Sequence, residues 1–156
     1  MDENRVATEV EGGEACVVLR PPTPGRFVFA SPHSGTIYPP EMGRDPALDE
    51  AALRSAEDAL VDRLIASGVA GGATVVLGRF GRAWVDLNRD PADLDPVLIE
   101  GIADGPVSAR TAAGYGVIPR LTGDGRALYD RRLSLAEARD RILRAHSPYH
   151  QQLAAR

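Results

Sequence analysis

Three short segments of this chain contain residue types that can ligate a metal or bind a carboxylate. The first is SPHSG at residues 31–35, in which His33 and Ser34 directly follow an apolar segment. Ligands gather at the carboxyl ends of strands in α/β sheets, so a histidine that leaves a strand there is placed to ligate a metal or to catalyse. The alternative interpretation is a turn histidine that hydrogen-bonds its own backbone.

The second segment carries two adjacent carboxylates, Glu57 and Asp58, in the alanine- and leucine-rich stretch 49–67. A projection at about 100° per residue places Glu57 within the apolar stripe of a predicted helix and Asp58 at its shoulder. A carboxylate on an apolar stripe is paired or coordinates a metal, unless it lies at the wet end of the stripe. Helical periodicity therefore favours Glu57 over Asp58 as a ligand.

The third segment brings four polar groups together after an apolar strand. They are Arg82, Asp86, Asn88 and Arg89. An Asn-Arg pair at the end of a strand can hold a carboxylate through charge-assisted hydrogen bonds, and Asp86 could orient one of the arginines. The alternative is a surface cluster of salt bridges, which contributes little to stability. The density of polar groups favours carboxylate binding.

Two ring side chains, Tyr149 and His150, follow Pro148 near the end of the last predicted helix. The proline interrupts the helix and is expected to kink it, which aims both side chains at the body of the domain. Packing is the default role for this pair. The neighbouring His146 has no supporting context and receives no role.

Short strands and one long helix are predicted to position these groups. Apolar stretches at 15–19 and 27–31, separated by PPTPG, predict a hairpin or two adjacent strands. Helical spacing predicts a helix over 49–67, and the unbroken apolar run 73–77 predicts a strand covered on both faces. A further strand is predicted at 83–87. This order indicates an α/β layer with a crossover and a central sheet between helices.

The C-terminal half of the chain is expected to be a long excursion followed by a helix. Residues 90–132 contain many turn residues and little periodicity, which predicts an excursion over the surface, of the kind used as a lid or binding loop. Ser134 and Glu137 have the spacing of a capping box, so a helix is predicted from there to residue 153. No strand is predicted after this helix, which makes the sheet look unfinished.

Composition bounds the class of protein. At 156 residues the chain is expected to form one domain or part of one, with a flexible N-terminus at residues 1–13. The net charge of −4 argues against nucleic acid as a partner, because nucleic-acid binders carry a basic excess. All 18 basic residues are arginines, which excludes Schiff-base lysine chemistry and a P-loop lysine.

Cysteine usage and hydropathy narrow the chemistry and the location. The single cysteine, Cys16, cannot form an internal disulfide or a thiolate metal site, so a metal would be held by nitrogen and oxygen. No apolar run approaches the length that spans a membrane, and the acidic start lacks the features of a secretory signal. The sequence therefore predicts a cytoplasmic protein with no membrane partner.

Taken together, these segments resemble the N-formylglutamate amidohydrolase family. The resemblance runs from residue 28 to residue 153 and rests on the order and spacing of its motifs. The matching pieces are PHSG at 32–35 with Tyr38-Pro39, D-x-x-V-D-x-L at 58–64, Gly72-Ala73, Arg82 followed by VDLNRDP at 85–91, and PYHQQL at 148–153. Gly81 departs from the pattern, since the family usually has serine before the arginine.

The resemblance implies a fold and an activity. The fold would be a three-layer α/β sandwich with a mixed, mostly parallel sheet of the zinc carboxypeptidase-like (phosphorylase/hydrolase-like) class. Residues 14–156 would be the N-terminal part of a single, truncated α/β hydrolase domain. The activity would be metal-dependent hydrolysis of N-formylglutamate, or of a related N-acyl amino acid, to formate and glutamate, a step of histidine degradation. An unfinished sheet edge would favour self-association.

The resemblance also implies roles for individual residues. His33 and Asp58 would ligate zinc, with Glu57 as the alternative to Asp58, and the third ligand would come from an Asp-x-His-Ser motif that this chain lacks. The groups that bind the carboxylate of a small-molecule substrate would be Arg82, Asn88 and Arg89. The supporting residues would be Ser34, Asp86, Tyr149 and His150. These motifs do not identify a general base.

A competing hypothesis is a non-catalytic domain that binds carboxylates, or a partner, through Arg82, Asn88 and Arg89. Two ligands without a third bind zinc weakly and rarely define a catalytic centre. The chain by itself is therefore expected to be an incomplete hydrolase with little activity.

Overall fold

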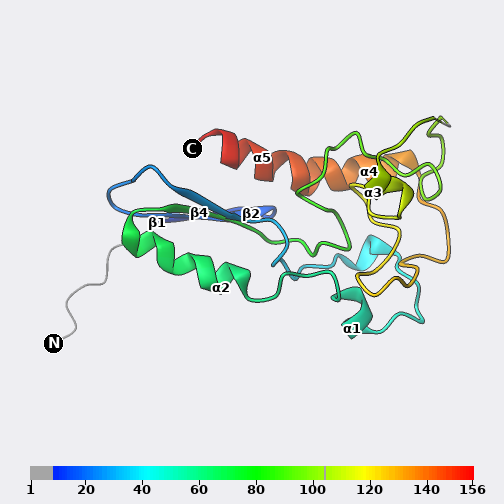
Figure 1. Cartoon of the computed structure of the whole chain (residues 1–156), viewed down its shortest axis with the longest axis horizontal. Helices are drawn as coiled ribbons and strands as arrows, with labels where there is room; N and C mark the ends of the chain where they lie inside the picture. Colours follow the sequence, from blue (N-terminus) through cyan, green and yellow to red (C-terminus); the bar gives the residue numbers. More distant parts are fainter. Residues whose placement is uncertain (1–8, 104) are drawn as a thin grey trace.

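A four-stranded sheet forms one end of the molecule (Figure 1). The computed structural model describes residues 9–103 and 105–156. The strands, in the spatial order β1-β2-β4-β3, are β1 (Glu9–Gly12), β2 (Cys16–Arg20), β3 (Val28–Ser31) and β4 (Thr74–Gly78). β1 falls within residues 1–13, which the sequence assigns to a flexible N-terminus. Residues 9–12 are instead part of the sheet, and residues 1–8 lie outside the described residues.

The sheet is mixed, as the sequence predicts, but its described pairings are not mostly parallel. β2 pairs antiparallel with both β1 and β4, and β3 pairs parallel with β4. The predicted pairing of 15–19 with 27–31 is wrong, because β4 lies between β2 and β3. Val75 and Val76 of β4 are fully buried, so this strand occupies the centre of the sheet, where both of its edges are paired.

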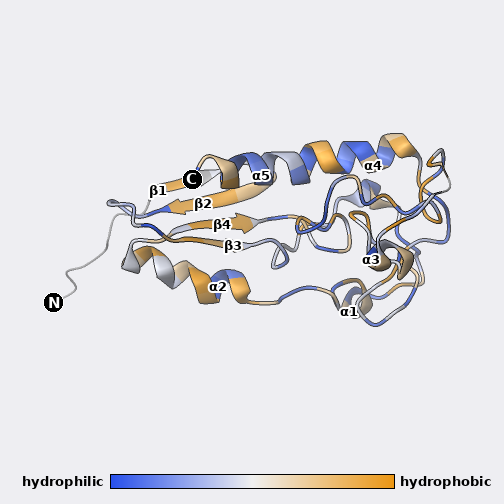
Figure 2. Cartoon of the chain, turned by 45° about the horizontal axis from the view of Figure 1, so that its top comes forward, coloured by the Kyte–Doolittle hydropathy of each residue, from blue (hydrophilic) through white to orange (hydrophobic). Residues whose placement is uncertain are grey.

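Helices cover both faces of the sheet and make three layers (Figure 2). α2 (Val61–Ala66) lies on one face, and α5 (Ser147–Ala154) lies on the other. α4 (Leu135–Arg141) continues into α5 through the π-helical turn Ile142–His146. The remaining short helices are α1 (Glu50–Leu53), α3 (Ala109–Ala112) and the 3-10 turns Pro40–Met42 and Ser67–Gly71. In residues 9–103 and 105–156, no helix has the length and apolar character needed to cross a membrane.

The single helix predicted over 49–67 is wrong, because the segment divides into α1 and α2. The backbone N–H of Asp58 donates to the carbonyl of His33 at 3.0 Å, so it is not available to a helical acceptor. Leu60 then adopts a left-handed conformation with φ of 68° just before α2. Leu60 and Leu64 are exposed, and the projection of one continuous helix does not apply to Glu57 or Asp58.

The strand predicted at 83–87 is also wrong. This segment is a hydrogen-bonded turn, in which the N–H of Trp84 donates to the carbonyl of Gly81 at 3.0 Å. Its apolar side chains, including those of Trp84, Val85 and Leu87, are nevertheless fully buried. The apolar run 83–87 therefore predicts the burial of these side chains correctly, but it does not predict their secondary structure.

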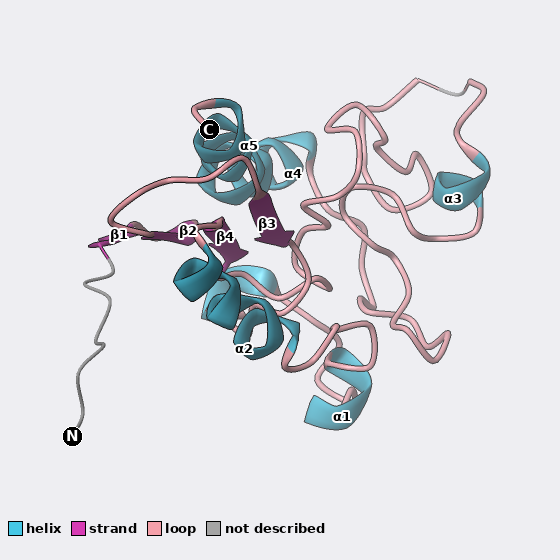
Figure 3. Ribbon diagram, turned by 60° about the vertical axis from the view of Figure 1, so that its left-hand side comes forward, coloured by secondary structure: helices cyan, strands magenta, loops and turns pink. Residues whose placement is uncertain are grey.

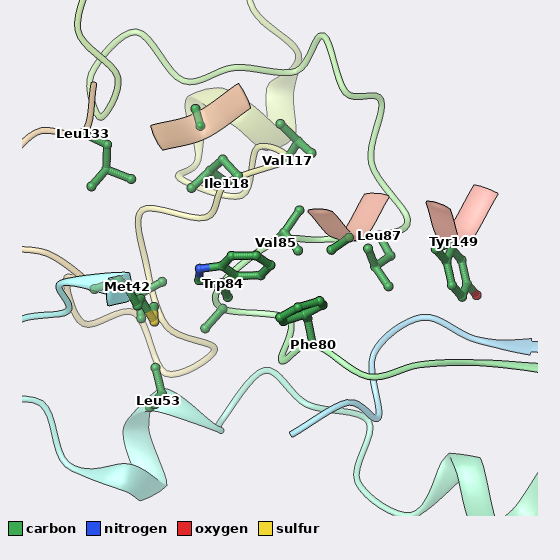
Figure 4. Close-up of a cluster of buried hydrophobic side chains, with 14 of the residues drawn as sticks. Met42, Leu53, Phe80, Trp84, Val85, Leu87, Val117, Ile118, Leu133 and Tyr149 are labelled. Carbon is green, nitrogen blue, oxygen red and sulfur yellow. The ribbon is translucent and has the colours of Figure 1, made fainter. Parts of the chain in front are cut away.

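The long segment between β4 and α4 is mostly irregular, as predicted (Figure 3), and its residues 105–110 and 123–127 are exposed, but other parts of it are buried. Its own apolar side chains form a core, drawn in Figure 4, in which Val117, Ile118 and Leu133 are fully buried. The ring of Phe80 stacks on Trp84 with centroids 4.3 Å apart. Arg141 of α4 closes this core and donates hydrogen bonds to the Tyr129 hydroxyl and to two backbone carbonyls.

The C-terminal helix begins where the sequence predicts. The Ser134 hydroxyl accepts from the N–H of Glu137, and the Glu137 carboxylate accepts from the N–H of Ser134, which completes the capping box. The sequence predicts a kink at Pro148. The irregular part of the helix is the π-helical turn Ile142–His146, which comes before Pro148, and Pro148 itself lies in the first turn of α5. A π-helical turn inserts a residue and rotates the side chains that follow it.

Candidate functional site

His33 lies between two carboxylates. Its Nδ1 is 3.2 Å from Oδ2 of Asp58, and its Nε2 is 2.7 Å from Oδ1 of Asp86. The side chains of His33 and Asp86 are buried, whereas 53% of the Asp58 side chain is exposed. One ring nitrogen therefore faces the interior of the protein, and the other faces a carboxylate that solvent or a ligand can reach.

The loop that presents His33 is held against the segment after β4. A Cβ atom at Gly35 would lie only 2.4 Å from the carbonyl oxygen of Phe80, so only glycine permits this approach. The N–H of Ile37 donates to the Arg79 carbonyl at 3.0 Å. Ser34 is buried and its hydroxyl bonds that of Ser31, which ties the loop to the end of β3. The glycine and the serine of the PHSG motif thus fix where the histidine points.

Asp86 collects hydrogen bonds from several donors. Its carboxylate accepts from Nε2 of His33, from Nε of Arg82 at 3.1 Å and from the backbone N–H of Asn88 at 2.9 Å. Burial alone would raise the pKa of Asp86, but the hydrogen bond and charge of His33 and the charge of Arg82 outweigh it and lower the pKa to about 2. Asp86 is therefore ionised at neutral pH and can only accept hydrogen bonds.

An ionised Asp86 determines which nitrogen of His33 carries a proton. Nε2 donates to Asp86, so in the neutral ring Nδ1 directs its lone pair at the Asp58 carboxylate. A proton or a metal ion between these two atoms satisfies both. Two ligands of one tetrahedral zinc ion lie about 3.4 Å apart, given bonds of about 2.0–2.2 Å. The observed 3.2 Å therefore fits a shared ion, with Asp86 as the outer partner that orients the ring.

Glu57 points to a different set of partners. Its side chain is 3% exposed and accepts hydrogen bonds from the Tyr38 hydroxyl at 2.7 Å and from Nε of Arg54 at 2.9 Å. Burial, together with the adjacent Glu57, raises the pKa of Tyr38, so the phenol remains a donor. The buried Glu57 carboxylate is thus paired with Tyr38 and Arg54, and it makes no contact with His33. A Cβ at Gly81 would lie 2.0 Å from the Tyr38 ring, which accounts for glycine at this position.

A cavity of about 310 Å³ adjoins Asp58 and Asp86. Its lining includes three arginines, Arg82, Arg89 and Arg110, and the ring of Tyr115. Nε of Arg89 lies 3.7 Å from the Asp86 carboxylate, so two of the arginines share that one anion. The cavity has the size of a pocket for a small molecule, and its arginines are suited to carboxylate groups.

Comparisons with known proteins show the family to which this chain is related. The sequence model of the N-formylglutamate amidohydrolase family matches residues 25–156. This chain belongs to the N-formylglutamate amidohydrolase family. The family resemblance drawn from the motifs is therefore confirmed.

Two crystal structures are similar to this family member. N-formylglutamate amidohydrolase from Ralstonia eutropha JMP134 is 34% identical, with a TM-score of 0.81 over 90% of this chain and 51% of that protein. Gene product Atu2144 from Agrobacterium tumefaciens is 24% identical, with a TM-score of 0.57 over 92% of this chain and 49% of that one, and shares the fold. No curated protein sequence matches. The chain spans about half the length of both solved structures.

The NRDP motif of the family is held in place from α5 and the π-helical turn. Nε2 of His146 bonds the carbonyl of Arg89, and Nε2 of His150 bonds the carbonyl of Leu87, each at 2.7 Å. The two imidazole rings stack with centroids 4.3 Å apart. His150, and His146, to which the sequence gives no role, therefore both hold the backbone of this segment. Burial lowers the pKa of His146, which keeps its ring neutral.

Asn88 and Tyr149, both named from the sequence, lie outside the cavity, as do His33, Ser34 and His150. The Asn88 side chain is exposed and does not line it, although its backbone N–H bonds Asp86. Tyr149 is 2% exposed and packs in the core, where its ring meets that of His150 edge-on. Asn88 and Tyr149 therefore contribute through the backbone or through packing.

The sequence analysis missed Arg110 and Tyr115 on the cavity wall. They lie in or just after α3, whose N-cap Ser108 is the one local signal in a segment without periodicity. The contact that brings this segment to the site is long-range: the N–H of Asp86 donates to the carbonyl of Val117 at 2.8 Å. No pattern within residues 105–118 predicts that contact.

Proposed function

We propose that this chain carries the substrate cavity and two metal ligands of a hydrolase that cleaves N-formylglutamate, or a related N-acyl amino acid, to formate and the amino acid. The observation that carries the proposal is His33 held between Asp58 and Asp86 at the edge of a cavity with three arginines. Family membership supports the reaction class. The substrate and the dependence on metal are parts of the proposal.

His33, through Nδ1, and Asp58 would hold a zinc ion or another divalent metal. The ion, when bound, polarises the formyl carbonyl and lowers the pKa of a coordinated water. Asp86 keeps the proton of His33 on Nε2, which leaves Nδ1 as the donor atom. In the described residues, no group of three His, Cys, Asp or Glu side chains could hold a metal. We expect the third ligand from the part of the family's length that this chain does not span.

Arg82 and Arg89 would bind the carboxylate next to the scissile amide. They already lie beside Asp86, and Nε of Arg89 is buried without a hydrogen-bond partner among the described residues. An unpaired buried donor is costly, so a carboxylate oxygen that accepts from it would stabilise the complex. His146 and His150 fix the backbone on either side of Asn88 and so limit where Arg89 can reach.

The carboxylates that line the cavity are all engaged. Glu57 accepts from Tyr38 and Arg54, Asp58 faces His33, and Asp86 accepts from His33 and Arg82. We therefore assign the role of general base to none of them. The family fold class that we propose, a zinc carboxypeptidase-like sandwich, is supported by the three layers around the mixed sheet.

A second candidate is a domain that binds carboxylates without catalysis. It is favoured by one observation, the three arginines of the cavity, which can bind a carboxylate without a metal ion. The two candidates differ in what zinc does. In a hydrolase, zinc and substrate occupy one site and should strengthen each other's binding, whereas a simple carboxylate-binding domain is indifferent to zinc.

The test is calorimetric titration of the purified chain with N-formylglutamate, with and without zinc, alongside an assay for released formate. Zinc should tighten ligand binding, His33→Ala should abolish that effect, and Arg89→Gln should weaken binding in both conditions. Formate release should be slow, because two protein ligands make a weak centre. The matched control is Arg126→Gln, which removes an exposed arginine paired with Asp49 and Asp124. Equal binding with and without zinc would favour the non-catalytic domain, and no binding at all would contradict both.

A further inference from the structure

The arginine-lined cavity contains more positive charge than one carboxylate needs. Arg54 neutralises Glu57, and in the proposed function Asp58 is committed to the metal ion that it would share with His33, so neither anion is left to compensate the arginines. The charges that remain are those of Arg82, Arg89 and Arg110 against the one carboxylate of Asp86, a net charge of +2. A ligand with two carboxylates would balance it.

Arg110 stands apart from the other two arginines. Arg82 and Arg89 come from the segment after β4 and share Asp86, whereas Arg110 belongs to α3 in the long irregular segment. Within the described residues, its guanidinium makes no hydrogen bond and no ion pair. An arginine that lines a cavity without an anion is available for a ligand.

The wall that carries Arg110 is fixed before any ligand binds. The N–H of Tyr115 donates to the carbonyl of Arg110 at 2.8 Å, and the N–H of Val117 donates to the carbonyl of Asp93 at 2.9 Å. Thr111 and Val117 are fully buried beside it. The hydrogen bond from the N–H of Asp86 to the carbonyl of Val117 ties this wall directly to the carboxylate that orients His33. The backbone of Arg110 is thus held at a set place relative to His33 and Asp58.

We propose that Arg110 determines substrate specificity by binding the side-chain carboxylate of an N-acylated acidic amino acid, with the hydroxyl of Tyr115 as a second donor. This inference rests on the proposed function. In such a substrate the main-chain carboxylate is attached to the carbon that bears the scissile amide, so it belongs near Asp86, where Arg82 and Arg89 lie. The side-chain carboxylate lies further along the molecule and needs a separate cation.

Tyr115 is suited to that role because its hydroxyl is weakly committed. Its one described hydrogen bond, to the carbonyl of Thr122, is 3.5 Å long. A phenol hydroxyl at that distance gains by turning toward a carboxylate oxygen. The pair of Arg110 and Tyr115 would then discriminate a carboxylate from the amide of the same shape, because the amide offers the guanidinium no negative charge.

The experiment measures binding to the metal-free chain, in which hydrolysis cannot interfere. N-formyl-L-glutamate and N-formyl-L-glutamine are titrated into the unmodified chain and into Arg110→Gln, Arg89→Gln and the control Arg126→Gln. The unmodified chain should bind N-formylglutamate about tenfold or more tightly than N-formylglutamine, which matches the loss of one charge-assisted hydrogen bond. Arg110→Gln should remove this preference and leave the affinity for N-formylglutamine unchanged, whereas Arg89→Gln should weaken both ligands.

Two results distinguish failure of this inference from failure of the proposed function. If the unmodified chain binds both ligands and Arg110→Gln retains the preference, or weakens both ligands equally, Arg110 is not the specificity residue and the proposed function stands. If the unmodified chain binds neither ligand, the proposed function fails and this inference fails with it. Circular dichroism of each variant verifies that it is folded.

Discussion

The two ends of this molecule differ in how regular secondary structure and the burial of apolar side chains go together. The sheet end has four strands, yet large apolar side chains are exposed in or just before its edge strand β3 and the neighbouring α2: Phe27, Val28, Phe29, Leu60 and Leu64. The irregular end has one short helix in its described residues 79–103 and 105–134, yet it buries large side chains completely, among them Trp84, Ile99 and Ile118. Extensive burial in this molecule therefore does not require hydrogen-bonded secondary structure.

The candidate site lies where these two ends meet. His33 follows β3 at the sheet end, and Asp86, Arg89 and Arg110 come from the irregular end. An active site built from loops needs those loops to be fixed by packing. The core of the irregular end, closed by Arg141 from α4, supplies that fixation.

The largest expected effect is on Trp84, at the centre of the irregular end. Trp84→Ala removes a buried ring that stacks on Phe80 and should lower the free energy of unfolding by about 3–5 kcal/mol. Leu64→Ala, in the regular helix α2, should change it by less than about 0.5 kcal/mol, because Leu64 is 74% exposed. Urea denaturation of the two variants measures the difference. Similar losses in both would contradict the comparison between the two ends.

The next largest effect is expected at Arg141, which links α4 to the irregular end. Its guanidinium donates to the Tyr129 hydroxyl and to the carbonyls of Trp84 and Met42, and the residue is 3% exposed. Arg141→Met leaves these buried acceptors without a donor and should cost about 2–3 kcal/mol. Arg139→Met, on the exposed side of the same helix, is the matched control. A cost no larger than that of the control would show that the packing does not depend on this link.

The sequence predicted those parts of the fold whose signals are local. β4 follows from an unbroken apolar run, and the C-terminal helix follows from the capping box of Ser134 and Glu137. The helix over 49–67 failed because a contact with His33, 25 positions away from Asp58, takes the backbone N–H that a helix would use. The run 83–87 failed because apolar residues in a buried turn look the same as those in a buried strand.

The sequence predicts the site residues that belong to motifs. It does not predict the residues of the cavity wall that contacts between distant parts of the sequence bring to the site. The PHSG and VDLNRDP motifs name His33, Asp86 and Arg89, which the structure brings together. Motif register favours Asp58 and helix phase favours Glu57, and the structure puts Asp58 next to His33 because the helix is broken. Arg110 reaches the cavity through the contact of Asp86 with Val117, for which no local pattern exists.

A smaller effect is expected at the capping box of the C-terminal helix. Ser134→Ala should cost about 1 kcal/mol, since it removes the acceptor for the N–H of Glu137.

The hydrogen bond from Arg131, with those from Ser134, lowers the pKa of Glu137 from 4.5 to about 2. Because this pKa is lowered in the folded state, the ionised Glu137 carboxylate stabilises the fold above pH 4.5, and that stabilisation is lost as the pH falls toward 2. Glu137→Gln should therefore make unfolding less sensitive to pH in that window, as urea titrations at pH 5 and pH 3 would show; an unchanged sensitivity would contradict it.

The smallest effect on stability, and a distinct effect on association, is expected at the exposed edge. Phe27 is 70% exposed next to β3, so Phe27→Lys should change the free energy of unfolding by less than about 0.5 kcal/mol. An exposed apolar edge strand favours pairing between chains, and we expect the unmodified chain to self-associate through it. Sedimentation velocity should show less association in Phe27→Lys. A monomeric unmodified chain would contradict this expectation.

The central claim is that His33 and Asp58, and not Glu57, form the metal-binding pair. Calorimetric titration of the purified chain with zinc, which registers weak binding at equilibrium, tests it most directly through Asp58→Asn and Glu57→Gln. The account predicts that Asp58→Asn loses the zinc bound by the unmodified chain, and that Glu57→Gln, which keeps an acceptor for Tyr38 and Arg54, retains it. Loss of zinc in Glu57→Gln with retention in Asp58→Asn would contradict the account.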